Sequence, residues 1–529
     1  MSSNNNRFGD TSLGVDVVLD EDIMKNAPHC PHGPTLLFER YFQGGKSGRK
    51  FFACSACRDR KDCNFFQYED DKVSAVRQEV RYQHNQSKQP PFKHLDYYKR
   101  YKDLLNLPPC KRCYCHECSL LLVEEEAQQG HKNHRVITGL SEEDLKKPSY
   151  LLDPLVDKKT NAQYLFNQNA VTFLVSTIQR LGFNRVLCIG TPRLHEMILS
   201  LKGSKDDTGL ESLLLDIDHR YYQFYSPEHF SRYNMFNHYF FDGEGCQKNC
   251  QEFLNRDGGE GVVMVTDPPF GGLVEVLAFT VKRIMGWWKE GTSDSCSSKE
   301  LPVIWTFPYF LEFRILQCLP SFHMSDYKVA YDNHTLFQCD KTNKGSPVRH
   351  FTNISPIEFV LPEEEGYRFC VKCQRYVSSV NVHCLKCDQC TSKDGRTYTH
   401  CDQCSRCVKP GRVHCSSCNQ CELPDHVCVT NKALIGCHIC GDPTHKRRQC
   451  PQTVRSDRLQ KKRKHHNPSQ GHLLDPQSER SSNNIKKTKR PQPRAVDDDK
   501  IESCKHRWRK QKCHRNKRRF KSVKSKKKK

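Results

Sequence analysis

The chain has 529 residues, a formal net charge of +23 and 31 cysteines. Its length implies about three to five folded units rather than a single core. A membrane-spanning segment and a secretion signal are not expected, because the sequence shows neither a run of about 18 apolar residues nor a basic start followed by an apolar stretch. The cysteines then need an explanation other than disulfides, and the positive charge favours nucleic acid as the partner.

The first Cys/His cluster lies in residues 27–70, after a polar lead at residues 1–26 that is predicted to be disordered. Its spacing suits a tetrahedral Zn²⁺. The segment resembles a GRF-type zinc finger, and that resemblance implies the ligands Cys30, His32, Cys54 and Cys63. Cys57 competes for the site, because it forms a CxxC pair with Cys54. Aromatic and basic side chains alternate here, which suits single-stranded nucleic acid.

A second finger follows a connector. Residues 71–109 carry charges and aromatic side chains and predict a basic helical connector. Residues 110–140 predict a C2H2-like finger, although the two histidines are closer together than usual. The ligands predicted for it are Cys115, Cys118, His131 and His134. Cys110 and Cys113 are alternatives to the other pair of cysteines.

Residues 150–365 contain few cysteines, and short apolar runs alternate there with helical patterns. This alternation predicts an α/β domain of Rossmann-like type, with a parallel sheet covered by helices on both faces. Ligands of such a sheet meet at the carboxyl ends of the strands. The strand-like runs are RVLCIG, SLLLDID, GVVMVTDPPF and VIWTFPYF. Four segments carry the candidate functional residues, in the order RVLCIG, SLLLDID, NHYFFDG and GVVMVTDPPF.

Three of these segments end in candidates for cofactor binding. Gly190 and Arg193 follow the first, where a small residue lets the turn approach a ligand. Asp216 ends the second and could accept hydrogen bonds from ribose hydroxyls. Asp242 follows aromatic residues that could enclose an adenine. A solvated turn at Asp216 and ordinary core packing of the aromatic residues are the alternative interpretations.

The fourth segment stops at consecutive prolines, which cannot continue a strand because they lack the N–H group. The rigid turn can direct a carboxylate and a backbone carbonyl at an exocyclic amine while an aromatic ring stacks on the base. The predicted catalytic residues are Asp267, Pro268, Pro269 and Phe270.

This DPPF sequence resembles the Asp/Asn-Pro-Pro-aromatic signature of amino-methyltransferases, in their N6-adenine branch. The segment before the first strand is similar to a Gln-aromatic segment of the same enzymes, which implies cofactor contacts from Gln163, Tyr164, Leu165 and Phe166. Together with the zinc modules, the chain resembles the CCHC zinc-knuckle rRNA adenine N6-methyltransferases.

That resemblance implies S-adenosylmethionine and Zn²⁺ as cofactors and one target adenosine in the 28S rRNA of the large subunit. It also implies a role in rRNA processing and translation, a location in the nucleus and nucleolus with the cytoplasm as a further site, and protein partners from ribosome biogenesis.

Residues 366–430 are dense in cysteine, and the pattern HCxxCxxC recurs. The repeat predicts a zinc ribbon with two or three Zn²⁺ ions, whose pairing of ligands stays open. The candidate ligands are Cys370, Cys373, His383, Cys384, Cys387, Cys390, His400, Cys401, Cys404, Cys407, His414, Cys415, Cys418 and Cys421. The region also resembles the cysteine-rich part of DHHC palmitoyltransferases, but Asp425–Cys428 reads DHVC, so a structural role of zinc is favoured.

Residues 435–452 have the spacing of a retroviral-type zinc knuckle, a module that binds single-stranded RNA. Its ligands would be Cys437, Cys440, His445 and Cys450. Residues 453–529 predict a disordered basic tail, and KKRK at residues 461–464 predicts nuclear or nucleolar targeting.

Two other functions stay compatible with the sequence. One is a protein-lysine N-methyltransferase of the same DPPF family, against which the several RNA-type fingers argue. The other is a catalytically inactive RNA-binding scaffold of zinc fingers.

Overall fold

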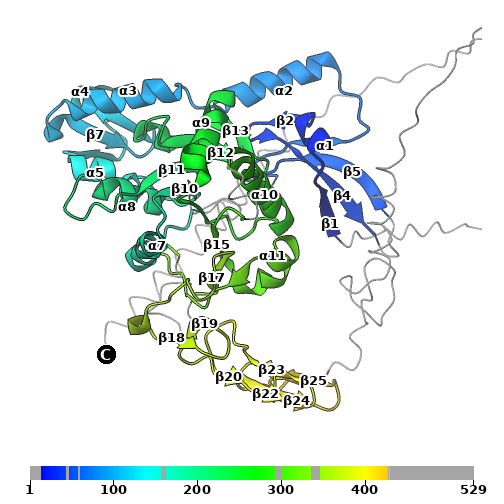
Figure 1. Ribbon diagram of the computed structural model, residues 1–529. Coiled ribbons are helices and arrows are strands. Elements are labelled where there is room, and N and C mark those ends of the chain that lie inside the picture. Colours follow the sequence, from blue (N-terminus) through cyan, green and yellow to red (C-terminus); the bar gives the residue numbers. More distant parts are fainter. Residues whose placement is uncertain are drawn as a thin grey trace, which may run out of the picture. The chain divides into compact units, whose positions relative to one another are not determined.

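The computed structural model describes residues 14–42, 47–57, 60–155, 163–292, 299–334, 346–426 and 428, which all belong to one compact unit, Met1–Leu459 (Figure 1). The expected zinc knuckle and basic tail lie outside the described residues. No helix in the described part is long and apolar enough to cross a membrane.

The N-terminal finger is built on an antiparallel sheet with the strand order β1-β4-β5-β6. Three rings stack across it: the ring centroids of Phe38 and Phe51 are 5.7 Å apart, and those of Phe51 and Phe66 are 5.1 Å apart. The elements of the finger are β1 (Gly14–Val18), α1 (Glu21–Lys25), β2 (His29–Cys30), β3 (Gly33–Pro34), β4 (Leu36–Tyr41), β5 (Ser47–Ala53) and β6 (Phe66–Tyr68).

The connector contains two helices, α2 (Ala75–Ser87) and α3 (His94–Leu105). The α3 helix packs on the central domain through His94, whose ring lies 4.4 Å from that of Tyr222. The second finger then forms a small antiparallel sheet of order β8-β7-β9. The elements that follow α3 are η1 (Pro109–Lys111), β7 (Arg112–Cys115), β8 (Leu120–Val123), α4 (Glu124–Gly130), β9 (Val136–Thr138), α5 (Glu142–Lys146) and α6 (Pro148–Leu151).

The central domain contains a sheet of eight strands in the order β13-β12-β11-β10-β14-β15-β17-β16. The five strands β12, β11, β10, β14 and β15 are parallel to one another, whereas β13, β17 and β16 pair antiparallel. The strands are β10 (Arg185–Ile189), β11 (Glu211–Asp216), β12 (Phe230–Asn234), β13 (Tyr239–Phe240), β14 (Val262–Thr266), β15 (Val303–Pro308), β16 (His323–Met324) and β17 (Val348–Thr352).

The expectation of a parallel sheet was therefore correct for the inner strands and wrong for the edges. A parallel neighbour requires a crossover of about a dozen residues or more. Only residues 235–238 separate β12 from β13, so the chain turns back directly in an antiparallel hairpin.

Helices cover both faces of the sheet, and each face has its own apolar core. Along β10, Val186 and Cys188 belong to the core beneath α7 and α8, whereas Leu187 and Ile189 belong to the core beneath α9 and α10. This two-sided burial explains why β10 is apolar without alternation. The main helices are α7 (Gln168–Arg180), α8 (Pro192–Leu201), α9 (Glu244–Asn255), α10 (Val274–Gly291) and α11 (Glu312–Cys318).

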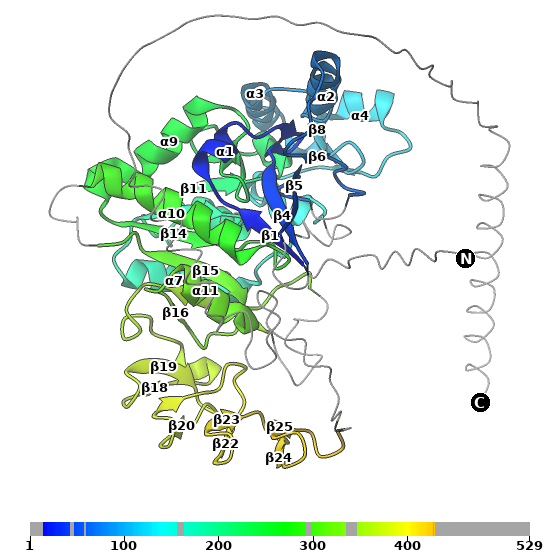
Figure 2. The same cartoon turned by 90° about the vertical axis from the view of Figure 1, so that its right-hand side faces the viewer.

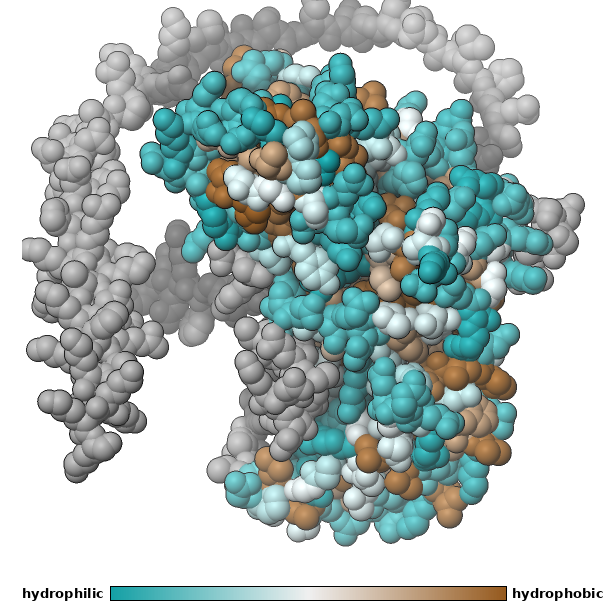
Figure 3. All heavy atoms as spheres, turned by 90° about the vertical axis from the view of Figure 1, so that its left-hand side faces the viewer, coloured by the Kyte–Doolittle hydropathy of each residue, from teal (hydrophilic) through white to brown (hydrophobic). Residues whose placement is uncertain are grey.

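The short 3-10 helices of this domain and of the segment behind it are η2 (His219–Gln223), η3 (Arg256–Gly259), η5 (Tyr309–Leu311) and η6 (Glu363–Glu365). On the face of the molecule drawn in Figure 3, hydrophobic residues are confined to separate areas among hydrophilic ones. The large apolar side chains of the central domain are instead buried in its two cores.

Four consecutive β-hairpins follow the central domain (Figure 2). Each turn holds one residue other than glycine at a φ between 48° and 50°, namely Gln374, Asp388, Ser405 and Asn419. The strands are β18 (Tyr367–Cys370), β19 (Arg375–Ser378), β20 (His383–Cys384), β21 (Gln389–Cys390), β22 (Thr399–Cys401), β23 (Arg406–Val408), β24 (Val413–Cys415) and β25 (Gln420–Glu422).

The first hairpin is attached to the central domain by the buried side chain of Asp326. Its carboxylate accepts hydrogen bonds from the backbone N–H of Ser378 at 3.0 Å and from Asn381 Nδ2 at 2.8 Å. Arg375 adds an ion pair at 3.1 Å.

Candidate active site and zinc centres

The DPPF turn lies at the carboxyl edge of the central sheet. The five residues of β14 are buried, and the strand ends at Thr266. The backbone N–H of Asp267 donates to the carbonyl of Ile189 at 3.1 Å, which attaches the turn to the end of β10. The N–H of Gly272 donates to the carbonyl of Pro269 at 2.7 Å and closes the turn. The catalytic sequence is thus placed at the edge where ligands of parallel sheets bind.

Gly190 is held against this turn in a conformation that favours glycine, with φ +66°. A Cβ atom at this position would lie 3.0 Å from Met235 Cε and 3.2 Å from the carbonyl oxygen of Asp267. The ends of the strands β10, β12 and β14 therefore come together around Gly190, which has no side chain. The missing side chain lets Met235 and the DPPF turn pack directly against Gly190, and the sequence predicts that the turn at Gly190 contacts S-adenosylmethionine.

The segment Gln163–Phe166 lies beside the DPPF turn. The Tyr164 ring stacks on that of Phe270, with centroids 5.5 Å apart and an interplanar angle of 28°. Phe166 forms a β-bridge with Tyr331. The backbone N–H of Leu165 donates to Asn333 Oδ1 at 2.9 Å. The structure therefore brings this segment to the predicted catalytic residues, as the family resemblance implies.

Two carboxylates follow β11 and differ in what they contact. Asp218 is paired with Arg220 at 2.6 Å and also accepts a hydrogen bond from Gln163 Nε2 at 2.8 Å. Asp216 Oδ1 accepts the backbone N–H of Asp218 at 2.9 Å. Burial, followed by the nearby Asp218, raises the pKa of Asp216 to about 7. Asp218 is thus held by protein groups, and Asp216 is the better candidate for a ribose hydroxyl.

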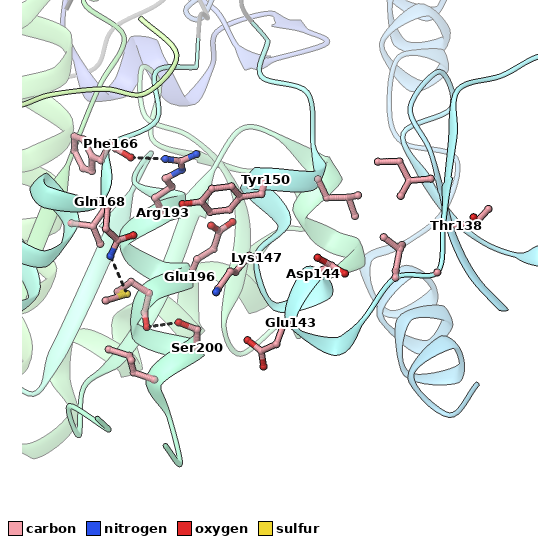
Figure 4. Close-up of a pocket in the computed structure, with 17 residues that line it drawn as sticks. Thr138, Glu143, Asp144, Lys147, Tyr150, Phe166, Gln168, Arg193, Glu196 and Ser200 are labelled. Atoms are coloured by element: carbon pink, nitrogen blue, oxygen red, sulfur yellow. Dashed lines mark hydrogen bonds between the residues drawn. The ribbon is translucent and has the colours of Figure 1, made fainter. Parts of the chain in front are cut away.

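Arg193 forms hydrogen bonds and an ion pair with protein groups and also lines a cavity. Its guanidinium donates to the carbonyl of Phe166 at 2.9 Å and to Ser149 Oγ at 3.2 Å, and it pairs with Asp332. It lies over the Tyr150 ring, on one side of a cavity of about 740 Å³ beside α7 and α8 (Figure 4). Its place in the structure is that of a residue that fixes the Gln163–Phe166 segment.

The same cavity contains Glu196, which Figure 4 shows beside Tyr150 and Lys147. Glu196 is buried and accepts hydrogen bonds from the hydroxyl and the backbone N–H of Ser149, both at 2.5 Å. Burial raises the pKa of Glu196 to about 7. These contacts attach α6 to α8, behind the predicted cofactor residues.

Asp242 follows the edge strand β13 and accepts a hydrogen bond from the Tyr222 hydroxyl at 2.6 Å. It interacts with Arg232, whose Nε donates to the carbonyl of Ile217 after β11 at 3.2 Å. The strand beside β11 is β12, which the sequence did not reveal because its residues FSRYN are mostly polar. Met235, directly after β12, is the residue that reaches Gly190. The assignment of Asp242 to the cofactor stays a prediction.

The predicted ligands of both N-terminal fingers come together. The ligand atoms within each of two groups lie within 4.8 Å of one another, and thiolates with imidazoles are the donors that Zn²⁺ prefers. The groups are Cys30, His32, Cys54 and Cys63, and Cys115, Cys118, His131 and His134. The competing Cys57 lies close by, with its Sγ 3.7 Å from His32 Nε2. Cys113 packs in a small apolar cluster with Leu122 instead.

The first finger is docked on the end of β12. Asn234 Nδ2 donates to the carbonyl of His32 at 2.8 Å, and Asn237 Nδ2 donates to that of Pro34 at 2.7 Å. A cavity of about 410 Å³ lies between the finger and the loop after Phe270, lined by Phe38, Phe51 and Phe65 on one side and by Gly271, Gly272, Leu273 and Val276 on the other.

In the hairpins, every group of ligands combines two successive repeats. The CxxC pair of one hairpin meets a histidine and a cysteine of the next. Three such groups are Cys370, Cys373, His383 and Cys390; Cys384, Cys387, His400 and Cys407; and Cys401, Cys404, His414 and Cys421.

Cys415 and Cys418 form a fourth group with His426 and Cys428, in which Cys428 Sγ lies 3.1 Å from both Cys415 Sγ and His426 Nε2. The described hairpins thus offer four sites, where two or three were expected. The sequence analysis missed His426 and Cys428 as ligands. Their signal was the DHVC sequence, which continues the alternation of histidine and cysteine.

Comparisons with known proteins agree with this arrangement. A family model described as probable N6-adenine methyltransferase matches residues 157–344, and one described as GRF zinc finger matches residues 28–72.

Three relatives are each named rRNA N6-adenosine-methyltransferase ZCCHC4. The Homo sapiens protein is 55% identical over 85% of this chain and 87% of its own length. The Mus musculus protein is 54% identical over 86% of this chain and 88% of its own length. The Xenopus tropicalis protein is 54% identical over 84% of this chain and 90% of its own length. The chain therefore belongs to the rRNA N6-adenosine-methyltransferase family.

Proposed function

We propose that this protein transfers a methyl group from S-adenosylmethionine to N6 of one adenosine in 28S rRNA. The observation that carries the proposal is the DPPF turn at the carboxyl edge of the sheet, where Asp267 lies against Gly190 and is hydrogen-bonded to the end of β10. An acceptor pair and a stacking ring at such an edge are the parts that methylation of an exocyclic amine requires.

The roles of the residues follow from their chemistry. The cofactor supplies a methyl group bound to a positively charged sulfur. Asp267 and the carbonyl of Pro268 accept the two hydrogens of the adenine amine, so that its lone pair faces the methyl group. Phe270 stacks on the base. Because the carboxyl group of Asp267 is surrounded by protein, its hydrogen bond to the amine is stronger than it would be in water.

The N-terminal finger supports RNA as the substrate. Arg49 lies 3.9 Å from the centroid of the Tyr68 ring, and Arg60 lies 4.5 Å from that of Phe66. Aromatic rings combined with guanidinium groups bind single-stranded nucleic acid by stacking and by contacts to phosphate. The cavity beside this finger is lined by Arg60 and by Gly271 and Gly272, which directly follow the DPPF turn in the chain.

We further propose that the protein acts in the nucleus and nucleolus, with the cytoplasm as a further site, and that it meets proteins of ribosome biogenesis there. The net charge of +23 and the KKRK sequence at residues 461–464 support this location. Microscopy of the tagged protein checks it: replacing KKRK by alanines should reduce the nucleolar signal, and an unchanged distribution would contradict the proposal.

The experiment that tests the substrate is site-resolved mass spectrometry of rRNA nucleosides from cells that lack the protein. One N6-methyladenosine of 28S rRNA should be lost, restored by the wild-type protein and left absent by the Asp267→Ala variant. Full methylation of 28S rRNA in the deficient cells would exclude the proposed target. Labelling of a protein lysine with radioactive cofactor would favour the lysine methyltransferase instead.

A further inference from the structure

The side chain of Asp267 has a hydrogen-bond donor of its own on a neighbouring segment. The hydroxyl of Tyr331 donates to Asp267 Oδ1 at 3.0 Å. Tyr331 is buried, with 1% of its surface exposed, and its backbone is fixed by the β-bridge to Phe166. Its ring also lies 5.9 Å from that of Phe270. The tyrosine is therefore held against both the acceptor and the stacking ring of the catalytic turn.

A carboxylate that accepts a hydrogen bond from an amine needs one oxygen in a defined position. A side chain attached by one freely rotating bond can turn either oxygen toward the substrate, and ordering it costs free energy. A hydrogen bond to Oδ1 removes this freedom and directs Oδ2 away from the tyrosine. The hydrogen bond also favours the ionised form of the acid, which accepts hydrogen bonds at both oxygens.

We propose that Tyr331 is a positioning residue for methyl transfer, whose hydroxyl holds Oδ1 of Asp267 so that Oδ2 is available to the adenine amine. This inference rests on the function proposed above. Tyr331 itself touches neither the amine nor the methyl group. It acts through Asp267.

The other groups described around Tyr331 and Asp267 either have partners of their own or carry no charge. Burial raises the pKa of Asp267 well above its usual value, and the hydrogen bond from Tyr331 opposes that rise. On the segment of Tyr331, Asp332 is paired with Arg193, and the His334 ring lies 4.2 Å from that of Tyr164. The neighbouring turn contributes Gly190 and the half-buried Met235, which carry no charge.

The test compares Tyr331→Phe with the wild type in full-length, zinc-loaded protein, using an RNA that contains the target adenosine. The variant keeps the ring and loses only the hydroxyl. A hydrogen bond to a charged group corresponds to a loss of about tenfold or more in kcat. The KM values for S-adenosylmethionine and RNA should change by less than about twofold, because ground-state binding is kept.

The pH dependence of kcat distinguishes positioning of Asp267 from a merely structural role of Tyr331, because a structural role would not shift it. Without the hydroxyl, the pKa of Asp267 rises further, so the fall of kcat on the acid side should begin at a higher pH in Tyr331→Phe. In Asp267→Asn, which does not titrate, adding Tyr331→Phe should cause no such shift. Tyr233→Phe is the matched control, because it removes another buried hydroxyl that lies 2.6 Å from His238 Nδ1.

An unchanged kcat and pH profile in Tyr331→Phe would overturn the proposal, and so would a rise in kcat, which would identify the hydroxyl as an obstruction. Activity that survives in Asp267→Ala would instead overturn the proposed catalytic function. The two failures are therefore distinguishable.

Discussion

The central domain and the cysteine-rich hairpins differ in what holds them together. In the central domain, apolar side chains from both faces of the sheet form two extended cores. In the first hairpins, the buried cluster consists of Cys370, Val377 and Cys390, with Cys373 packed against it. Isolated two-stranded hairpins have little stability in water. The difference indicates that burial of apolar surface orders one region, whereas zinc orders the other.

The sharpest test of this comparison is removal of zinc by a chelator. Structural zinc contributes on the order of 10 kcal/mol to the folding of small finger peptides. We therefore expect the hairpins between Tyr367 and Cys428 to lose their protection against hydrogen exchange, while β10, β11 and β14 keep theirs. Mass spectrometry of exchanged peptides measures both regions in one experiment. Equal protection of the hairpins with and without zinc would contradict the conclusion that zinc orders them.

The next largest effect is expected for methyl transfer in the central domain, the region whose folding does not depend on zinc. Asp267→Ala removes one acceptor of the amine, and loss of one such group typically costs about 10²- to 10³-fold in kcat. Methyl incorporation into RNA should fall by about this amount, whereas zinc content, measured by atomic emission, should stay at the wild-type value. A loss of zinc together with activity would show that the two regions are not separate.

A smaller effect is expected at the glycine turn. Gly190→Ala introduces a Cβ atom 3.0 Å from Met235 Cε, at a φ of +66°. A residue other than glycine in this backbone region costs about 1 kcal/mol or more. We expect a lower melting temperature and weaker binding of S-adenosylmethionine in calorimetry.

Gly182→Ala is the matched control, because Gly182 has a φ of +78° but nothing within 4 Å of a Cβ atom. It should lower the melting temperature through backbone strain alone and leave cofactor binding unchanged. Weaker cofactor binding in both variants would mean that strain in general, rather than the contact at Gly190, is responsible.

The contrast between the central domain and the hairpins also explains which features were predictable from sequence. The end of β14 could be located because prolines must stop a strand, and β10 because four apolar residues follow Arg185 without interruption and are all buried. By contrast, β12 was missed. Its Ser231, Arg232 and Asn234 are buried polar residues, and the Nδ2 group of Asn234 donates to His32 and Ser55 of the first finger, which no local pattern reveals.

The pairing of zinc ligands was unpredictable for a related reason. The repeat HCxxCxxC left the pairing open, and in the structure His383, His400 and His414 each complete the site of the preceding hairpin. That choice depends on how successive hairpins stack. Similarly, the hydrogen bond from the Tyr222 hydroxyl to Asp242, which follows the edge strand β13, joins residues far apart in any local pattern.

The interleaved sites lead to the smallest expected effect. His426 belongs to the last site alone, with Cys415, Cys418 and Cys428, and no described hairpin follows it. His426→Ala should therefore remove about one Zn²⁺ per chain and leave the other hairpins folded. His400→Ala, in the middle of the row, should release more zinc, because its site joins two hairpins that each contribute to a further site.

Zinc stoichiometry by atomic emission and hydrogen exchange of residues 367–408 compare the two variants directly. Equal losses would mean that all four sites fold as one unit, and zinc would then order the hairpins as cooperatively as the apolar cores order the sheet. A single zinc lost in both variants would mean the opposite, that each site is independent despite the shared hairpins. The expected result lies between these limits, because each hairpin shares ligands only with its neighbours.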